Sequence, residues 1–325
     1  MSTHEINKVA VVGAGYMGGG IASVLAAAGL EVVIADADAD VTRRHHERLL
    51  AEWGEFEQGG LVDEGTTDLV AEHLTWAETI EDAVGTADFV EEAVPEDPHI
   101  KSEVLRRIEA AARPDAVIGT NTSTIPIGGL AEALGDPSRF LGVHFSNPAP
   151  FIPGVEVIAH TGTAESVVPP VEEMVARTGK LTARVNDKAG FVLNRLQFVL
   201  LKEAIALVEE GVATAEDVDI VVRTTFGYRL GFFGPFAIAD MAGLDTYRGG
   251  FATLEEHYGE RLRAPEMLNA LVDAGKLGVK QGGGFVTQGG DQKALVEYRN
   301  TAYARLAQLL RELGPAPLAT KTEAP

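Results

Sequence analysis

A glycine-rich turn between an apolar strand and a helix restricts the fold of this chain more than any other feature. Residues 8–12, KVAVV, form a short valine-rich run of the kind that becomes a buried parallel strand. The stretch GAGYMGGG follows at 13–20 and leads into a helix of small residues that ends at Gly29. A second apolar run, EVVIAD, ends at Asp36. Strand, glycine turn, helix and strand together predict one βαβ unit of about thirty residues.

Within this unit, Gly13, Gly15 and Gly18 have the GxGxxG spacing of a dinucleotide-binding turn. The first glycine permits the tight turn, the second lets a pyrophosphate approach the backbone, and the third lets the helix pack closely on the strand. N–H groups at the start of the helix, beside Met17, would bind the phosphates. Asp36 would accept a hydrogen bond from a ribose 2′-hydroxyl and repel a 2′-phosphate, which favours NAD over NADP. FAD, which shares the motif, and a glycine turn without a cofactor are the alternatives.

Strand and helix patterns continue to alternate up to about residue 187. Further strands are expected in five apolar runs, at residues 87–96, 115–121, 139–145, 154–158 and 181–185. Residues 41–82 are expected to form one or two helices. The alternation predicts an α/β fold with an N-terminal, doubly wound sheet of the Rossmann type over 1–187. Helical patterns over 188–313 predict an all-α C-terminal domain, and the segment 314–325 is expected to be a disordered tail.

The composition limits the classes of partner. The chain has 27 basic and 48 acidic residues, and its net charge of −21 repels nucleic acid and anionic membranes. It has no cysteine, so disulfides, thiolate metal sites and cysteine nucleophiles are excluded, and we predict no metal site. No apolar run is long enough to cross a bilayer, and the first residues lack an apolar segment of the signal-peptide kind. We therefore expect a cytoplasmic protein that binds neither nucleic acid nor membranes.

Polar side chains that can move protons follow several of the expected strands. His144 lies at a strand end in LGVHFSNP, and Glu156 lies near the start of the next strand. Two adjacent strands joined by a short loop can bring these side chains together. A neutral imidazole can take the hydroxyl proton of an alcohol as hydride leaves, while a carboxylate on its other nitrogen fixes the tautomer. Ser123 in NTSTIPI and Asn194 in the following apolar helix could hold the reacting oxygen and a neighbouring carbonyl.

Each of these residues also has a purely structural interpretation. From the residues alone, His144 is more often a strand-end histidine with satisfied hydrogen bonds, and Glu156 a solvated strand end. Asn147 precedes Pro148 and has the character of a turn residue. Asn194 in an apolar helix could serve packing or capping. Taken alone, these residues suggest a catalytic group without establishing one.

The same stretches resemble the 3-hydroxyacyl-CoA dehydrogenase family. The resemblance rests on GAGYMGGGIA, NTSTIPI, GVHFSNPAP, VEVI, AGFVLNR, GPFAIADMAGLD and KQGGGF, which follow the family's order over nearly the whole chain. It implies a Rossmann NAD-binding domain, a helical domain that forms the dimer interface, and an active site in the cleft between them. The implied protein is an NAD-dependent dehydrogenase acting on CH–OH donors, a homodimer whose residues 188–313 serve substrate binding and dimerisation.

The resemblance also implies a role for each matching position. His144 would be the catalytic acid/base, with Glu156 as its carboxylate partner. Ser123 would bind the reacting oxygen, and Asn194 would contact the substrate. Asn147 would support the site, and Glu96 and Lys101 would lie by the cofactor ribose and nicotinamide. The residues expected on the cofactor side are therefore Gly13, Gly15, Met17, Gly18, Asp36, Glu96, Lys101 and Asn147.

Two departures separate this sequence from the enzymes that act on CoA esters. Those enzymes have a lysine three residues before the glutamate of VEVI, where this chain has Pro153. Their lysine-rich helices after the second strand meet the CoA phosphates, which need positive partners, whereas residues 47–82 here contain one arginine, Arg48, and no lysine. The sequence is more similar to the branch that acts on small free hydroxy acids. That branch includes L-gulonate 3-dehydrogenase (the lens lambda-crystallin relatives), carnitine dehydrogenase and a pyridine-carboxylate dehydrogenase of vitamin B6 breakdown.

We therefore expect the substrate to be a small hydroxylated carboxylic acid, oxidised from a secondary alcohol to a ketone or formed in the reverse direction. Its carboxylate requires a cation, and the candidates are Arg195, Arg223 and Arg229. Arg229 is preferred because it lies in the apolar, glycine-bearing stretch FGYRLGFFGP, although each arginine could instead form a surface salt bridge. The alternatives are an L-3-hydroxyacyl-CoA dehydrogenase, an aldehyde-oxidising enzyme, and a non-catalytic NAD(H)-binding structural or regulatory protein.

Overall fold

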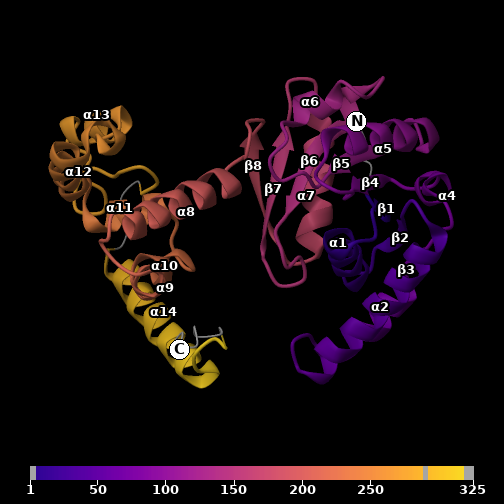
Figure 1. Ribbon diagram of the computed structural model, residues 1–325, viewed down its shortest axis with the longest axis horizontal. Helices are drawn as coiled ribbons and strands as arrows, with labels where there is room; N and C mark the ends of the chain where they lie inside the picture. Colours follow the sequence, from indigo (N-terminus) through magenta and orange to yellow (C-terminus); the bar gives the residue numbers. More distant parts are fainter. Residues whose placement is uncertain (1–4, 288–291, 318–325) are drawn as a thin grey trace. The chain divides into compact units, whose positions relative to one another are not determined.

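The computed structural model describes residues 5–287 and 292–317, which form two compact units (Figure 1). The first unit is Met1–Leu201 and the second is Lys202–Pro325. In the described part of the chain, no helix is long and apolar enough to cross a membrane.

The division between the units falls within helix α8 (Leu193–Glu209), later in the chain than the boundary expected near residue 187. Asp187 itself belongs to the first unit, where its carboxylate accepts hydrogen bonds from the N–H groups of Ile127 and Gly128. The tail expected to be disordered lies outside the described residues from 318 onward.

An eight-stranded sheet forms the centre of the first unit. In spatial order its strands are β3 (Leu74–Trp76), β2 (Glu31–Ala35), β1 (Lys8–Val12), β4 (Phe89–Glu92), β5 (Val117–Thr120), β6 (Phe140–Phe145), β7 (Gly154–Ala159) and β8 (Leu181–Asn186). Neighbouring strands are parallel except β6 and β7, which are antiparallel. The N-terminal ends of β7 and β8 therefore lie at the same edge as the carboxyl ends of β1 to β6, where ligands bind in open sheets of this kind.

Helices cover both faces of the sheet (Figure 1). One face packs against α1 (Tyr16–Ala27), α2 (Ala39–Gln58), α3 (Thr66–His73) and α7 (Val168–Arg177). The other face packs against α4 (Ile80–Val84), α5 (Pro98–Ala111) and α6 (Ile127–Ala131). Each interface is a cluster of buried aliphatic side chains, with Val11 and Ile21 in the first and Val12 and Leu105 in the second. The prediction of a doubly wound α/β domain is confirmed.

The segment 41–82 differs from the expectation of helices alone. It contains most of α2, all of α3 and the start of α4, but also the edge strand β3. This strand is only three residues long and pairs in register with β2, where Val32 lies opposite Leu74. Three residues are too few to show an alternating pattern, so the strand is specified by its neighbour in the sheet.

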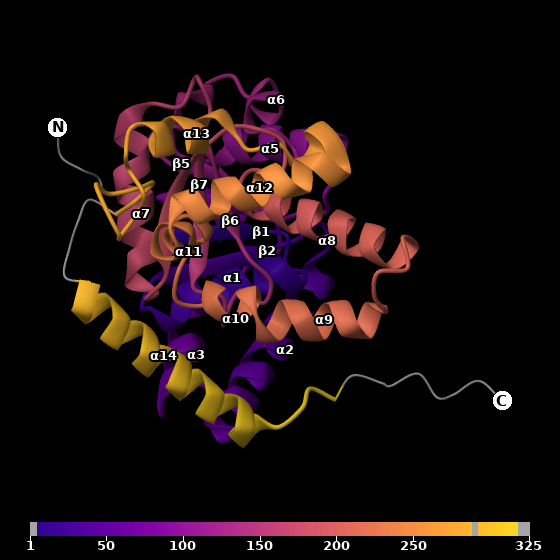
Figure 2. The same ribbon diagram turned by 90° about the vertical axis from the view of Figure 1, so that its left-hand side faces the viewer.

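The second unit is helical, as predicted. After α8 it contains α9 (Ala215–Thr224), α10 (Phe226–Leu230), α11 (Pro235–Ala242), α12 (Leu244–Tyr258), α13 (Glu266–Asp273) and α14 (Gln292–Leu313). Helices α12 and α13 pack side by side (Figure 2), around a small cluster that includes Leu244, Leu268 and Val272. The aromatic residues of the FGYRLGFFGP stretch mostly pack within this unit, because Tyr228, Phe232 and Phe233 gather around Tyr303 of α14.

Candidate active site

His144 and Glu156 lie directly opposite each other on β6 and β7. The antiparallel register turns both side chains to the same face, and His144 Nδ1 is 2.8 Å from Glu156 Oε2. His144 is only 4% exposed, so this hydrogen bond is shielded from bulk water. An ionised carboxylate can only accept, so Nδ1 carries a proton, and in the neutral imidazole Nε2 then has the lone pair.

The other oxygen of Glu156 is bound by the backbone at the start of α8. Oε1 accepts hydrogen bonds from Val192 N–H at 2.9 Å and Leu193 N–H at 3.0 Å. Burial raises the pKa of Glu156, but the hydrogen bonds from His144, Leu193 and Val192 outweigh it, and the pKa lies below its usual value. Glu156 is therefore ionised at neutral pH and can fix the imidazole tautomer.

Ser123 lies on the other side of the His144 ring. Its Oγ is 3.2 Å from His144 Nε2, and its carbonyl accepts a hydrogen bond from Asn194 Nδ2 at 2.9 Å. The structure thus brings together all four residues that were expected to carry the chemistry. Glu156, His144 and Ser123 form one line of hydrogen bonds, and Asn194 holds the backbone at its end.

Glu96 holds the turn on which Ser123 lies. Its Oε1 accepts hydrogen bonds from Thr122 Oγ1 at 2.8 Å and from the N–H groups of Ser123 and Thr124, each at 2.9 Å. Burial raises the pKa of Glu96, whereas these hydrogen bonds and the charge of Lys101 lower it by more, so the carboxylate is ionised. The sequence placed Glu96 beside the cofactor, and the structure adds this support of the serine turn.

Two cavities of the first unit adjoin at Met17, Asn121 and Ser123. One, of about 410 Å³, is also lined by Gly13, Gly15, Tyr16, Asp36, Ala93, Val94, Pro95 and Glu96. The other, of about 490 Å³, is also lined by His144, Phe145, Ser146, Asn147, Ile152, Leu193, Asn194 and Gln197. A cofactor site and a substrate site must be neighbours for hydride transfer, and these two cavities meet that requirement.

The glycine turn fits a bound dinucleotide. Gly13 has a φ of 102°, and a Cβ there would lie 2.7 Å from the backbone of Ala93. A Cβ on Gly18 would overlap the carbonyl oxygen of Gly13, so the helix could not pack this closely on the turn. No atom lies within 4 Å of the Cβ position of Gly15, which leaves its backbone open to a phosphate.

Asp36 lies at the end of β2, on the rim of the glycine-lined cavity. Its Oδ2 accepts a hydrogen bond from Ala14 N–H at 2.8 Å and its Oδ1 accepts one from Ala37 N–H at 2.7 Å. Each carboxylate oxygen can accept a further hydrogen bond, so the ribose hydroxyls of NAD have partners here.

Three of the expected cofactor residues do not line the glycine-lined cavity. Gly18 is buried in the first turn of α1. Lys101 is 1% exposed, and its Nζ donates to Glu92 Oε1 at 2.9 Å and to the Val94 carbonyl at 3.2 Å. It therefore lies beneath the cavity wall. Asn147 lines the cavity that contains His144.

One residue near the site was missed by sequence reasoning. Lys180 is 7% exposed, and its Nζ donates to the carbonyl of Ile152 at 2.7 Å. Burial lowers the pKa of Lys180. Because Lys180 directly precedes β8, whose N-terminal end lies at the active-site edge, recognising that β7 and β8 run opposite to the other strands would have indicated it.

None of the described residues that line the two cavities is an arginine. Arg195 is exposed in the first turn of α8, next to Asn194. Arg223 and Arg229 belong to the second unit, where Arg229 is half-buried in α10. Their expected role as carboxylate-binding cations stays a prediction.

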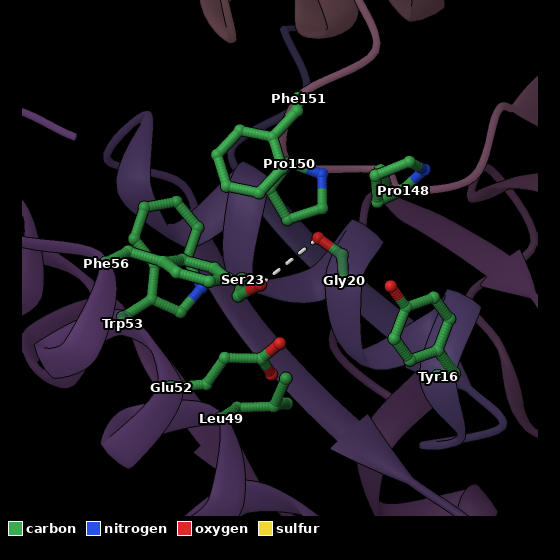
Figure 3. A pocket seen from close by; sticks show the side chains of 11 residues that line it. Tyr16, Gly20, Ser23, Leu49, Glu52, Trp53, Phe56, Pro148, Pro150 and Phe151 are labelled. Atoms are coloured by element: carbon green, nitrogen blue, oxygen red, sulfur yellow. Dashed lines mark hydrogen bonds between the residues drawn. The ribbon is translucent and has the colours of Figure 1, made fainter. Parts of the chain in front are cut away.

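A third cavity lies between α1, α2 and the loop after β6 (Figure 3). The rings of Phe56 and Phe151 meet edge to face, with their centroids 5.1 Å apart. The ring centroids of Trp53 and Phe56 are 5.9 Å apart. The cavity has a volume of about 30 Å³, with room for one or two water molecules. It is therefore a packing defect in the contact between α2 and the loop, too small to hold a substrate.

The sequence matches two family models, one after the other. Residues 8–188 match the NAD-binding domain of 3-hydroxyacyl-CoA dehydrogenase, and residues 190–288 match its C-terminal domain. The chain is 38% identical over 289 residues to a 3-hydroxybutyryl-CoA dehydrogenase of Mycobacterium tuberculosis, covering 87% of this chain and 98% of the relative. It is 36% identical over 282 residues to a 5-formyl-3-hydroxy-2-methylpyridine 4-carboxylate 5-dehydrogenase of Mesorhizobium japonicum, covering 86% and 90%.

Solved structures show the same two kinds of relative. A 3-hydroxyacyl-CoA dehydrogenase of Archaeoglobus fulgidus matches with a TM-score of 0.77 and 32% identity, over 93% of this chain and 98% of that one. A 5-formyl-3-hydroxy-2-methylpyridine 4-carboxylic acid 5-dehydrogenase, described as an NAD⁺-dependent dismutase, matches with a TM-score of 0.71 and 35% identity, over 94% and 99%. The chain belongs to the 3-hydroxyacyl-CoA dehydrogenase family and is an NAD-dependent dehydrogenase acting on CH–OH donors.

Proposed function

We propose that the protein transfers hydride between NAD and a small hydroxylated carboxylic acid, with His144 as the acid/base and Glu156 as its partner. The observation that carries this proposal is the line of hydrogen bonds from Glu156 through His144 to Ser123, at 2.8 and 3.2 Å. It ends in a cavity that adjoins the glycine-lined one at Ser123.

His144 Nε2 takes the proton of the alcohol hydroxyl. At the same time, the C–H bond of the carbon that bears this hydroxyl breaks and the hydride leaves. Glu156 stabilises the imidazolium that forms, because its carboxylate already accepts the Nδ1 proton. Bound NAD supplies the acceptor for the hydride, and NADH supplies the hydride in the reverse direction. In that direction His144 returns the proton to the oxygen of the ketone.

Ser123 and Asn194 position the reacting group. The Ser123 hydroxyl lies within hydrogen-bonding reach of His144 Nε2, so it can bind the same substrate oxygen that His144 deprotonates. Asn194 donates to the Ser123 carbonyl and lines the same cavity, so it fixes the serine turn beside the substrate.

The charge of residues 47–82 favours a free acid over a CoA ester. The one arginine in residues 47–82, Arg48, is paired with Glu52 at 3.3 Å, so its charge is already matched. Pro153, at the position of the family lysine, provides no cation. The 3′-phosphate and pyrophosphate of CoA would find few positive partners on this side of the site.

An L-3-hydroxyacyl-CoA dehydrogenase is the second candidate function. It is favoured by the 38% identity to a 3-hydroxybutyryl-CoA dehydrogenase, which extends over almost the whole length of that relative. The pyridine carboxylate dehydrogenase is nearly as similar at 36% and has a substrate without CoA. The relatives include both kinds of substrate, and the charge argument is our reason for proposing the free acid.

Formation of NADH from NAD tests the choice of substrate. We would compare an L-3-hydroxybutyryl-CoA ester with gulonate, carnitine, 3-hydroxybutyrate and hydroxymethylpyridine carboxylates. Turnover of a free acid without turnover of the ester is expected. Efficient turnover of the ester would show that the missing lysines are not decisive and would establish the second candidate.

We also propose that the protein is a homodimer. Helix α8 exposes a run of large apolar side chains, including Phe198, Val199 and Leu201, each more than half exposed. Continuous apolar surface of this kind marks an interaction site. A light-scattering mass of twice the 34.4 kDa chain is expected, and a monomer mass would overturn this proposal.

A further inference from the structure

Phe191 has an unusual backbone conformation. Its φ is 47°, and it is the one non-glycine residue with positive φ in the described part of the chain. This left-handed region is disfavoured for residues with a side chain, above all for bulky ones. Phe191 is also 3% exposed, so the conformation is held inside the protein rather than in a surface loop. Strained residues of this kind gather where a site requires them.

The turn that contains Phe191 is tied to the segment after β5. Asp187 accepts hydrogen bonds from the N–H groups of Ile127 and Gly128 at 2.8 and 2.7 Å. Gly190 N–H donates to the carbonyl of Thr124 at 3.3 Å. These bonds join the turn to the segment that carries Ser123, and they hold the chain in place on the N-terminal side of Phe191.

The residues after Phe191 bind the carboxylate of the acid/base pair. With the chain reversed at Phe191, the N–H groups of Val192 and Leu193 both point at Glu156 Oε1, at 2.9 and 3.0 Å. The Phe191 ring lies against His144, with ring centroids 5.9 Å apart and planes inclined by 54°. One residue therefore touches the imidazole through its ring and controls the carboxylate through its backbone.

We propose that Phe191 is a positioning residue for the His144–Glu156 pair. Its ring limits the orientations of the imidazole and keeps water from its face. Its left-handed backbone aims two N–H groups at the oxygen of Glu156 that His144 does not use. This inference rests on the proposed function, in which His144 is the acid/base, and it extends that function to a residue that lines neither of the two adjoining cavities.

Two variants test the role of the ring. Phe191→Gly keeps the positive φ without strain and removes the side chain, whereas Phe191→Leu keeps apolar bulk but loses the aromatic contact with His144. Phe140→Leu is the matched control, because Phe140 is fully buried in the same apolar cluster and its ring neighbour is His160. Each variant would be compared in kcat, KM, NADH affinity and the pH profile of kcat/KM.

We expect both Phe191 variants to lower kcat about tenfold or more, since small displacements of reacting groups cost factors of this size. The KM for NAD and the NADH affinity should stay within about twofold. The pH profile of kcat/KM should change as well, because the geometry of the His144–Glu156 pair changes. Phe140→Leu should leave kcat and the pH profile unchanged.

Nitrogen-15 NMR of the histidine side chains tests the same inference without turnover. The Nδ1 proton of His144 should give a sharp, downfield resonance in the wild type and in Phe140→Leu, and a broadened one in Phe191→Gly. If both Phe191 variants keep the kcat, the pH profile and the His144 resonance of the wild type, the inference is wrong. If the wild type turns over no substrate, the proposed function fails, while the NMR comparison still decides the role of Phe191.

Discussion

His144 and Glu156 are cross-strand partners in the antiparallel pair β6 and β7, and their side chains are joined by a hydrogen bond of 2.8 Å. The strand register therefore sets the distance between the imidazole and the carboxylate. The two N–H groups at the start of α8 hold the other carboxylate oxygen, so the orientation of the pair is fixed from both sides.

Glu156→Gln should lower kcat by on the order of 100-fold or more, because an amide can donate to Nδ1 and stabilise the wrong tautomer. The folded pKa of Glu156 lies below its usual value, so its contribution to stability is present above the unfolded pKa and is lost as pH falls. Steady-state kinetics on the preferred substrate measures the loss of kcat. Glu172→Gln, which removes a surface ion pair with Arg184, is the control and should retain activity.

Asp36→Ser should narrow the preference for NAD over NADP by about tenfold or more. The change removes the charge that repels a 2′-phosphate and the acceptor for the ribose hydroxyl. The ratio of kcat/KM for the two cofactors measures it. Asp40→Ser removes a carboxylate in the first turn of α2 and serves as the control. An unchanged ratio in Asp36→Ser would place the ribose of the cofactor away from β2.

Glu91 should make the protein less stable as pH rises. The side chain is fully buried on β4, and neither carboxyl oxygen has a hydrogen-bond partner among the described residues. Burial, and then the charge of Glu92, raise the pKa of Glu91 well above its ordinary value of 4.5. In the unfolded chain, Glu91 ionises above its ordinary pKa of 4.5, whereas in the folded chain it stays protonated. The stability of the protein is therefore greatest below pH 4.5 and falls as pH rises toward the pKa of Glu91 in the folded state.

Glu91→Leu should raise the free energy of unfolding at pH 8 by on the order of 1–3 kcal/mol, the cost of a buried polar group without a partner. Glu91→Gln should abolish the fall in stability between pH 5 and pH 8, within about the error of urea denaturation. The exposed Glu165→Gln is the control. If Glu91→Leu lowers the free energy of unfolding at pH 8, the Glu91 carboxyl makes a stabilising interaction in the folded protein, and the prediction is wrong.

Asp240 should be essential to the stability of the second unit. It is fully buried, and its carboxylate accepts hydrogen bonds from the N–H groups of Phe285, Val286 and Thr287 at 2.9 to 3.0 Å. Asp240→Asn leaves some of these donors without a partner and should cost about 1–3 kcal/mol. Thermal unfolding should show this loss, and the more exposed Asp245→Asn should show little.

The fold and the pairing of His144 with Glu156 could be predicted because each depends on local pattern. The glycine turn, the apolar strands and Asp36 lie within one short βαβ segment, where spacing alone indicates the arrangement. His144 and Glu156 are separated by one short connection between two strands, so few registers are available. Asn194 and Ser123 are 71 residues apart in sequence. The family resemblance implied that both serve the substrate, but the hydrogen bond between them was not predicted.

Other features depend on contacts that no local pattern shows. Strand β3 exists because β2 offers an edge for pairing. Lys101 lies in an amphipathic helix, α5, and only the buried Glu92 on β4 explains why it points inward. The positive φ of Phe191 depends on the hydrogen bonds that Asp187 and Gly190 make with the segment after β5, and a phenylalanine gives no sign of it.

The central claim is that His144 transfers the proton, and His144→Ala tests it most directly. NADH affinity, measured by fluorescence titration, should be unchanged, because His144 does not line the glycine-lined cavity. Turnover should fall by about 100-fold or more, the usual contribution of a positioned acid/base. Turnover within about tenfold of the wild type would contradict the assignment of the base.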